Sequence, residues 1–137
     1  MLTLAEEDKA ISRATSHIGY CSTNGLKRAE SVVKEITRNN WTVRGGSVTR
    51  RMHMLVTTRV VQEARKHFGC DSLEGAELED YDGFNHWEAR VFGNEAMTGA
   101  RSGRMVMSRI TFALLEDSGW YKPNYSMAED CCSLAKI

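Results

Sequence analysis

The sequence predicts one α+β domain, or a piece of one, built mostly of helices with a few short strands. Its 137 residues are 42% hydrophobic and 26% charged, which is enough for a real core and too short for two domains. Segments with helical periodicity and segments rich in Val and Thr both occur, but they do not alternate as strands and crossover helices would. The chain contains one proline and no repeats or low-complexity segments, so a disordered chain is not expected.

The first half is predicted to form a helix followed by a β-hairpin. Over residues 26–38, apolar residues recur every three or four positions among charged ones, which is the pattern of an amphipathic helix. The apolar positions are Leu26, Ala29, Val32 or Val33, and Ile36. Residues 41–56 are rich in Val and Thr and are interrupted by Gly45 and Gly46, so we expect a hairpin with a glycine turn.

Two further helices are predicted in the second half. The first covers residues 59–68, with Thr58 as its cap and Gly69 as a left-handed stop. The second begins after Ser108, as its cap, and ends at Gly119. Between them, the acidic residues 70–85 are expected to form a loop with at most a short strand over 76–78. The aromatic pair that follows the last helix is expected to close the core and consists of Trp120 and Tyr121.

Charge is balanced overall but uneven along the chain. A formal net charge of zero and a pI near 6.9 give no global attraction to nucleic acid or to an anionic membrane. Residues 26–66 carry ten Lys or Arg against three acids, whereas residues 71–95 carry eight acids against Arg90 alone. We expect these two segments to attract and partly neutralise each other. Apart from Trp41, no aromatic residue is interleaved with the basic ones, so no nucleic-acid partner is expected.

Neither an export signal nor a membrane span is expected. Residues 1–8 carry three acids where a signal peptide would be basic and then apolar. The longest apolar runs are far shorter than the roughly 20 residues that cross a bilayer. The cysteines are Cys21, Cys70, Cys131 and Cys132. They form no CxxC pair, so a zinc ribbon is not supported, and disulfides are permitted without being required.

Of the four histidines, only His86 has neighbours that indicate chemistry. No histidine is followed by another four positions later, so no helical two-histidine metal face exists. His67 is expected to pack or cap the end of its helix, and His53 to occupy an ordinary strand position. His86 begins the string His-Trp-Glu-Ala-Arg, and Met97 follows it eleven positions later.

This string and spacing resemble the leishmanolysin family of zinc metalloendopeptidases, in the metzincin group. The resemblance extends from near Trp41 to Glu129, and it implies that residues 26–137 form the later part of a metzincin-like peptidase domain, with 1–25 a degenerate or poorly ordered segment. It implies that His86 is the third zinc ligand and that Met97 forms the turn beneath the metal, rather than filling a core gap. The resemblance gives Glu88 and Glu95 no catalytic role, and we expect both to form salt bridges to Arg90.

The sequence departs from the family at the first half of the metal site. The family's His-Glu-x-x-His helix is absent, and its nearest counterpart is Arg13-Ala14-Thr15-Ser16-His17. In this alignment His17 is the second zinc ligand, while Arg13 and Ala14 replace the first ligand and the general base. Zinc is expected from the family, yet two imidazoles beside a guanidinium make a poor site. Loss of the base alone costs about a hundredfold to ten-thousandfold in rate, so no catalytic residue is assigned.

The sequence therefore predicts a fragment or degenerate member of a zinc metalloendopeptidase family, inactive alone. The implied partner is a protein or peptide substrate. The alternative is a non-catalytic relative that serves as a protein-binding or structural module, and an incomplete gene model is a third possibility. The resemblance also implies a secreted or cell-surface protein, which suits a disulfide at Cys70, although no signal peptide is visible.

Overall fold

The computed structural model describes residues 20–22, 25–27, 31–80, 85–99 and 103–131. It is an α+β structure, as the sequence predicts, and its main sheet has the antiparallel order β3-β4-β5. The strands are β1 (Tyr20–Ser22), β2 (Gly25–Lys27), β3 (Val33–Val43), β4 (Gly46–Leu55) and β5 (Ala76–Leu78). The α-helices are α2 (Thr58–Phe68), α3 (Ala89–Phe92) and α4 (Arg109–Asp117), followed by a 3₁₀ turn at Tyr125–Met127. Most of the predicted N-terminal segment 1–25 lies outside the described residues.

The helix predicted over residues 26–38 is wrong, because Val33–Val43 forms strand β3. Ile36 is buried within β3, whereas Val32 lies in the turn before the strand and is buried in the separate main core, so their four-residue spacing does not mark one helical face. Ile36 lies opposite Met52 of β4 and packs with it in a small cluster. The β-branched residues of this segment favour a strand, and packing against β4 selects the strand over the helix.

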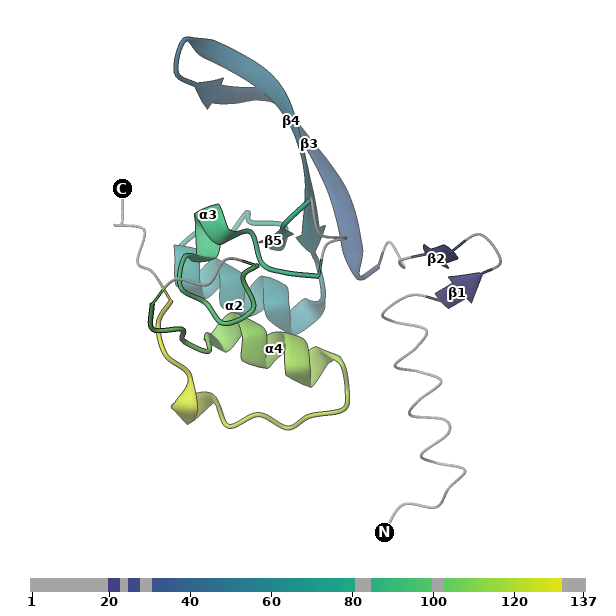
Figure 1. Ribbon diagram of the computed structural model, residues 1–137, viewed down its shortest axis with the longest axis vertical. Coiled ribbons are helices and arrows are strands. Elements are labelled where there is room, and N and C mark those ends of the chain that lie inside the picture. Colours follow the sequence, from purple (N-terminus) through teal and green to yellow (C-terminus); the bar gives the residue numbers. More distant parts are fainter. Residues whose placement is uncertain (1–19, 23–24, 28–30, 81–84, 100–102, 132–137) are drawn as a thin grey trace.

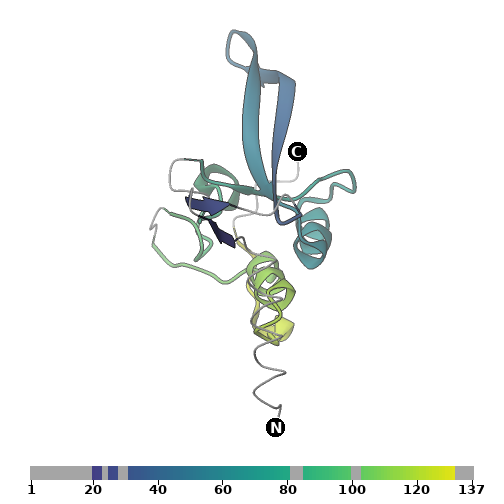
Figure 2. The same ribbon diagram turned by 90° about the vertical axis from the view of Figure 1, so that its right-hand side faces the viewer.

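Strands β3 and β4 form a long hairpin that stands away from the helices in both views (Figures 1 and 2). The predicted glycine turn is confirmed: Gly45 has a φ of 96° between Val43 and Gly46, which are register partners. The pairing starts at residue 33 rather than 41, so β3 is longer than expected, while β4 has about the expected length. The register shifts between Arg38 and Trp41, which marks a bulge in the ribbon.

The attraction predicted between the basic and acidic segments is confirmed at the base of this hairpin. Arg38 pairs with Glu74, and Arg50 of β4 lies 2.9 Å from the carboxylate of Glu77 in β5. The Arg50 guanidinium also lies over the Trp41 ring, 5.2 Å from its centroid. The Arg38 pair is exposed and stabilises little, whereas Glu77 is buried and needs its cationic partner.

Helix α2 begins one residue earlier than expected and is capped from a distant part of the chain. Its N-cap residue is Thr57, whose side chain makes no capping hydrogen bond. Instead, the carboxylate of Asp117, at the end of α4, accepts hydrogen bonds from the backbone N–H groups of Arg59 and Val60 at 2.9 and 3.2 Å. The predicted stop is confirmed, because Gly69 has a φ of 62° and donates its N–H to the carbonyl of Arg65.

Helix α4 follows the predicted signals closely. Ser108 caps it by accepting a hydrogen bond from the N–H of Thr111 at 3.3 Å, and Gly119 follows its end with a φ of 76°. The expected packing of the two aromatic residues after the helix is wrong. Trp120 is 60% exposed and Tyr121 58% exposed, so neither closes the core.

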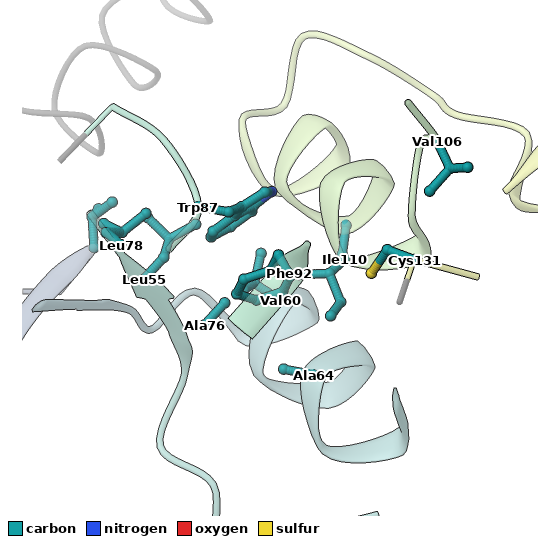
Figure 3. Packing of buried hydrophobic residues seen from close by; sticks show 12 residues of the cluster. Leu55, Val60, Ala64, Ala76, Leu78, Trp87, Phe92, Val106, Ile110 and Cys131 are labelled. Atoms are coloured by element: carbon teal, nitrogen blue, oxygen red, sulfur yellow. The ribbon is translucent and has the colours of Figure 1, made fainter. Parts of the chain in front are cut away.

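The main core lies where α2, α4 and the edge of the sheet meet. Val60 of α2 and Ile110 of α4 are fully buried, and between them and β5 the Trp87 and Phe92 rings stack with centroids 5.3 Å apart (Figure 3). Complete burial of such side chains stabilises by about 1.5–3 kcal/mol each. The buried members of the cluster are Val32, Leu55, Val60, Ala64, Ala76, Leu78, Trp87, Phe92, Val106, Ile110, Ala113 and Cys131.

The loop after α4 is held by Tyr125, and its phenol should titrate unusually late. Burial, and then a 2.7 Å hydrogen bond to Glu116, raise the pKa of Tyr125 to about 12 from an ordinary value of 10.0. A raised pKa in the folded state means that this contribution to stability is complete below the ordinary pKa and is lost as pH rises through the raised one. Tyrosinate absorbance during alkaline titration should therefore show a late step that Tyr125→Phe removes; a phenol of Tyr125 that ionises with the unfolded chain's tyrosines would contradict this.

Candidate functional site

His86 lies in a short extended segment beside strand β5. The N–H of Glu79 donates to the carbonyl of His86 at 3.0 Å, and the N–H of Glu88 donates to the carbonyl of Glu77 at 3.0 Å. Between these bonds, Leu78 and Trp87 form an antiparallel bridge. The backbone from the His86 carbonyl to the Glu88 N–H is thus fixed to the sheet on both sides of Trp87.

The structure also places Met97 against this segment. The N–H of Trp87 donates to the carbonyl of Met97 at 3.0 Å, and Trp87 forms a parallel bridge with Thr98. Helix α3 makes the reversal between them and ends at Gly93, which has a φ of 57°. The structure therefore places the Met97 backbone beside Trp87, the residue after His86, while the Met97 side chain packs against the main core. The roles of His86 and Met97 toward a metal remain predictions.

The other predicted ligand, His17, lies outside the described residues, as do Arg13 and Ala14. Within the described part of the chain, no three His, Cys, Asp or Glu side chains lie close enough together to hold a metal ion. The half-buried side chain of His86 can supply one imidazole. Catalytic zinc normally takes three protein ligands, and His86 is the predicted ligand that lies within the described residues.

Glu95 forms a buried polar network that the sequence did not reveal. The side chain is 0% exposed, and its Oε2 accepts a hydrogen bond from the N–H of Met97 at 2.6 Å. Its Oε1 accepts from the N–H and the hydroxyl of Ser108, both at 3.0 Å, and from the hydroxyl of Thr111. Thr111 Oγ1 in turn accepts from the indole Nε1 of Trp87 at 2.8 Å. In Figure 3 this indole nitrogen points toward α4.

The salt bridges expected for Arg90 are confirmed for one of the two glutamates. Arg90 lies 3.8 Å from Glu88 and makes two shorter bonds of 2.7 Å to Glu77. The expectation for Glu95 is wrong, because its carboxylate points into the core toward Ser108 and Thr111. Both donors come from the start of α4, thirteen or more residues away, so no local pattern around Glu95 announces its burial.

The structural roles expected for two other histidines are confirmed. His67 packs edge-on against Phe68 at the end of α2, with ring centroids 4.7 Å apart. Its Nε2 lies 3.8 Å from the sulfur of buried Cys131. His53 occupies a position in β4 and lies 3.0 Å from a carboxylate oxygen of Asp80.

A cavity of about 190 Å³ lies beside α2 and α4, and His86 is not among its lining residues. Its lining residues are Glu63, Lys66, His67, Arg109, Glu129 and Asp130. Glu63 of α2 reaches α4 through a 2.8 Å contact with Arg109, and it also lies 2.8 Å from Lys66 of its own helix. Burial alone would raise the pKa of Glu63, but these two hydrogen bonds outweigh it and lower the pKa. Three of the charged residues lining the cavity, Glu63, Lys66 and Arg109, are therefore paired with one another.

Two structural features bear on the expected cellular location: the state of Cys70 and the length of the helices. Cys70 is an exposed free thiol, so the described residues do not contain the disulfide suggested for it. None of the described helices is both long and apolar enough to span a bilayer.

Comparison with known proteins identifies close relatives. A model of the leishmanolysin peptidase family matches residues 14–133. The leishmanolysin-like peptidases of Drosophila pseudoobscura pseudoobscura and Caenorhabditis elegans are 56% and 51% identical over 104 residues, covering 73% of this chain and 15% and 16% of theirs. The ciliated left-right organizer metallopeptidase of Mus musculus is 36% identical over 115 residues, covering 78% of this chain and 15% of its own. No solved structure matches the chain. The chain thus spans about 15% of the length of these curated relatives.

Removing the Thr111 hydroxyl should weaken the whole network. Thr111→Val leaves the Trp87 indole N–H and one hydrogen-bonding site of Glu95 Oε1 without a partner in the core. The free energy of unfolding in urea should fall by about 2–4 kcal/mol, since each unsatisfied buried group costs about 1–3 kcal/mol. The matched change Thr42→Val, at an exposed strand position, should alter it by less than about 0.5 kcal/mol. Equal effects of the two changes would show that the network does not stabilise the fold.

Proposed function

Because the chain belongs to the leishmanolysin family of zinc metallopeptidases, we propose that it is part of a zinc metalloendopeptidase to which His86 contributes one metal ligand. The observation that carries this proposal is the hydrogen bond from the Trp87 N–H to the Met97 carbonyl. It places the methionine of the family's His-Trp-Glu and Met pattern directly beside the residue that follows the histidine. The Met97 segment is then the turn beneath the metal.

The backbone around His86 suits a ligand that must be held before the metal arrives. Adjacent side chains of an extended segment point to opposite faces. Trp87 is 1% exposed and occupies the core face, so the His86 side chain leaves the segment on the other face. The Glu79 N–H, bonded to the His86 carbonyl, fixes this direction.

The remaining ligands come from outside the described residues in this proposal. His17 is the second ligand, and it lies within the family match, which covers residues 14–133. Arg13 stands where the first ligand belongs, and its permanent charge opposes a cation. Ala14 stands where the general base belongs. A zinc ion in the complete family site activates a water for attack on a peptide bond, so this chain alone is proposed to be inactive on peptides.

A non-catalytic module for protein binding is the second candidate. It is favoured by the absence of the His-Glu-x-x-His string from the sequence beside a well-packed core. Metal content separates the two proposals, because a binding module needs no zinc. In either case the partner is a protein or peptide.

Zinc binding should depend on His86 and not on another histidine of the same chain. Equilibrium dialysis followed by metal analysis should find zinc bound weakly to the wild type and lost in His86→Ala. His67→Ala is the matched control, because His67 is also half-buried but lies on α2. Zinc that is retained in His86→Ala, or no zinc on the folded wild type, would favour the binding module.

Restoring the family motif should strengthen the site. The double substitution Arg13→His with Ala14→Glu creates His-Glu-Thr-Ser-His at residues 13–17 and removes a repelling guanidinium. We expect zinc affinity to rise by about tenfold or more, that is, by at least 1.4 kcal/mol, and His86→Ala in this background to abolish the gain. The same substitutions placed with His17→Ala are the control. An unchanged affinity would show that residues 13–17 are not the counterpart of the metal-binding helix.

A further inference from the structure

Glu95, Met97, Trp87 and Thr111 form a closed circuit of hydrogen bonds. The Met97 N–H donates to Glu95 Oε2 at 2.6 Å, and the Met97 carbonyl accepts from the Trp87 N–H at 3.0 Å. The circuit closes through the Trp87 indole, which donates to Thr111 Oγ1 at 2.8 Å, and through the Thr111 hydroxyl, which donates to Glu95. Both polar groups of the Met97 backbone are therefore fixed by neighbours that are themselves buried.

A carboxylate in this position is costly unless it is fully hydrogen-bonded. Glu95 is 0% exposed, and its described hydrogen bonds come from neutral donors: two backbone N–H groups and two hydroxyls. Hydrogen bonds to a charged group contribute about 1.5–3 kcal/mol each, which offsets the loss of hydration. An apolar residue would fill the same volume without holding the Met97 N–H, so the carboxylate has a geometric consequence beyond packing.

We propose that Glu95 is a positioning residue, which holds the Met97 turn against the His86 segment through this circuit and so sets the affinity of the His86 site for a divalent cation. The second part of this statement rests on the proposed function. The first part concerns only the backbone geometry around Met97. The two parts are tested by separate measurements.

Glu95→Gln separates the contact with Met97 from the contacts with Ser108 and Thr111, because the oxygen of the amide accepts hydrogen bonds and its NH₂ group donates them. The Glu95→Gln amide keeps one acceptor oxygen, which serves best against the three donors that now face Oε1. Its NH₂ group then faces the N–H of Met97, and two donors cannot bond to each other. The substitution therefore cuts the link to Met97 while leaving the bonds to Ser108 and Thr111.

Glu79→Gln is the matched control. Glu79 is also buried, at 3% exposed, and lies in the strand segment that pairs with His86. Its Oε1 accepts from the N–H of Ala89 at 3.2 Å, while its Oε2 has no hydrogen-bond partner among the described residues. An amide can therefore occupy this position without placing two donors face to face.

Amide hydrogen exchange on the full chain tests the positioning. In Glu95→Gln, the N–H groups of Met97 and Trp87 should exchange about tenfold faster or more, as expected for loss of a hydrogen bond to a charged group. The N–H of Phe92, bonded to the Glu88 carbonyl at 3.0 Å, should be unchanged, and Glu79→Gln should match the wild type at all three. Equal acceleration of all three amides, or of none, would overturn the proposal.

A wild-type measurement keeps the test decisive should Glu95→Gln fail to fold. In low concentrations of denaturant, the Met97 and Trp87 amides should open together with the same denaturant dependence, distinct from that of Phe92. Independent opening of Met97 and Trp87 would contradict a shared circuit.

Cobalt(II) titration tests the consequence for the site. The visible spectrum of bound Co²⁺ should appear with the wild type and with the control His67→Ala, and Glu95→Gln should need about tenfold more Co²⁺ or above, the effect typical of outer-shell partners. Equal affinity of Glu95→Gln and wild type would overturn this consequence. A wild type that binds no Co²⁺ would remove the proposed function itself, while the exchange result would still decide whether Glu95 positions Met97.

Discussion

The hydrogen bond from the Trp87 indole to Thr111 joins the hydrophobic core to the candidate site. The Trp87 ring stacks on Phe92 in the middle of the core, its indole N–H reaches α4, and its backbone N–H holds Met97. Trp87 therefore contributes apolar surface to the core, hydrogen-bonds its own buried indole N–H and supports the Met97 turn. Because Trp87 adjoins His86, any change that loosens the core around α4 also moves the proposed ligand.

Helices α2 and α4 are held together by charge as well as by apolar packing. Asp117 of α4 caps the first turn of α2, and Arg109 at the other end of α4 reaches Glu63 in the middle of α2. The two contacts lie at opposite ends of α4, so they fix its direction relative to α2 as well as its distance. The buried Glu63 carboxylate needs both of its cations, Arg109 of α4 and Lys66 of its own helix, and all three residues line the adjacent cavity.

The sequence was sufficient to predict features that depend on neighbouring residues, and insufficient to predict features that depend on partners far along the chain. The cap at Ser108 and the stops at Gly69 and Gly119 depend on neighbouring backbone groups, so both helices could be predicted from the sequence. Strand β3 was missed because apolar residues four apart suit either structure, and only pairing with β4 decides. Glu95 was missed for the same reason, since its partners belong to α4. The contact between the His86 segment and Met97 was suggested by family resemblance, not by periodicity.

The candidate site is organised by bonds that involve no metal. Backbone hydrogen bonds fix the His86 segment to β5 and to Met97, and the Glu95 carboxylate fixes Met97 to α4. In small zinc domains the metal supplies the folding free energy, whereas here apolar burial and buried hydrogen bonds already define this part. In the proposed site, binding of a cation would therefore cost little conformational entropy at His86, because the segment of this ligand is already ordered. In this proposal its affinity would be set by the remaining ligands, so the substitutions at residues 13 and 14 test the function, whereas substitutions in the core test the geometry.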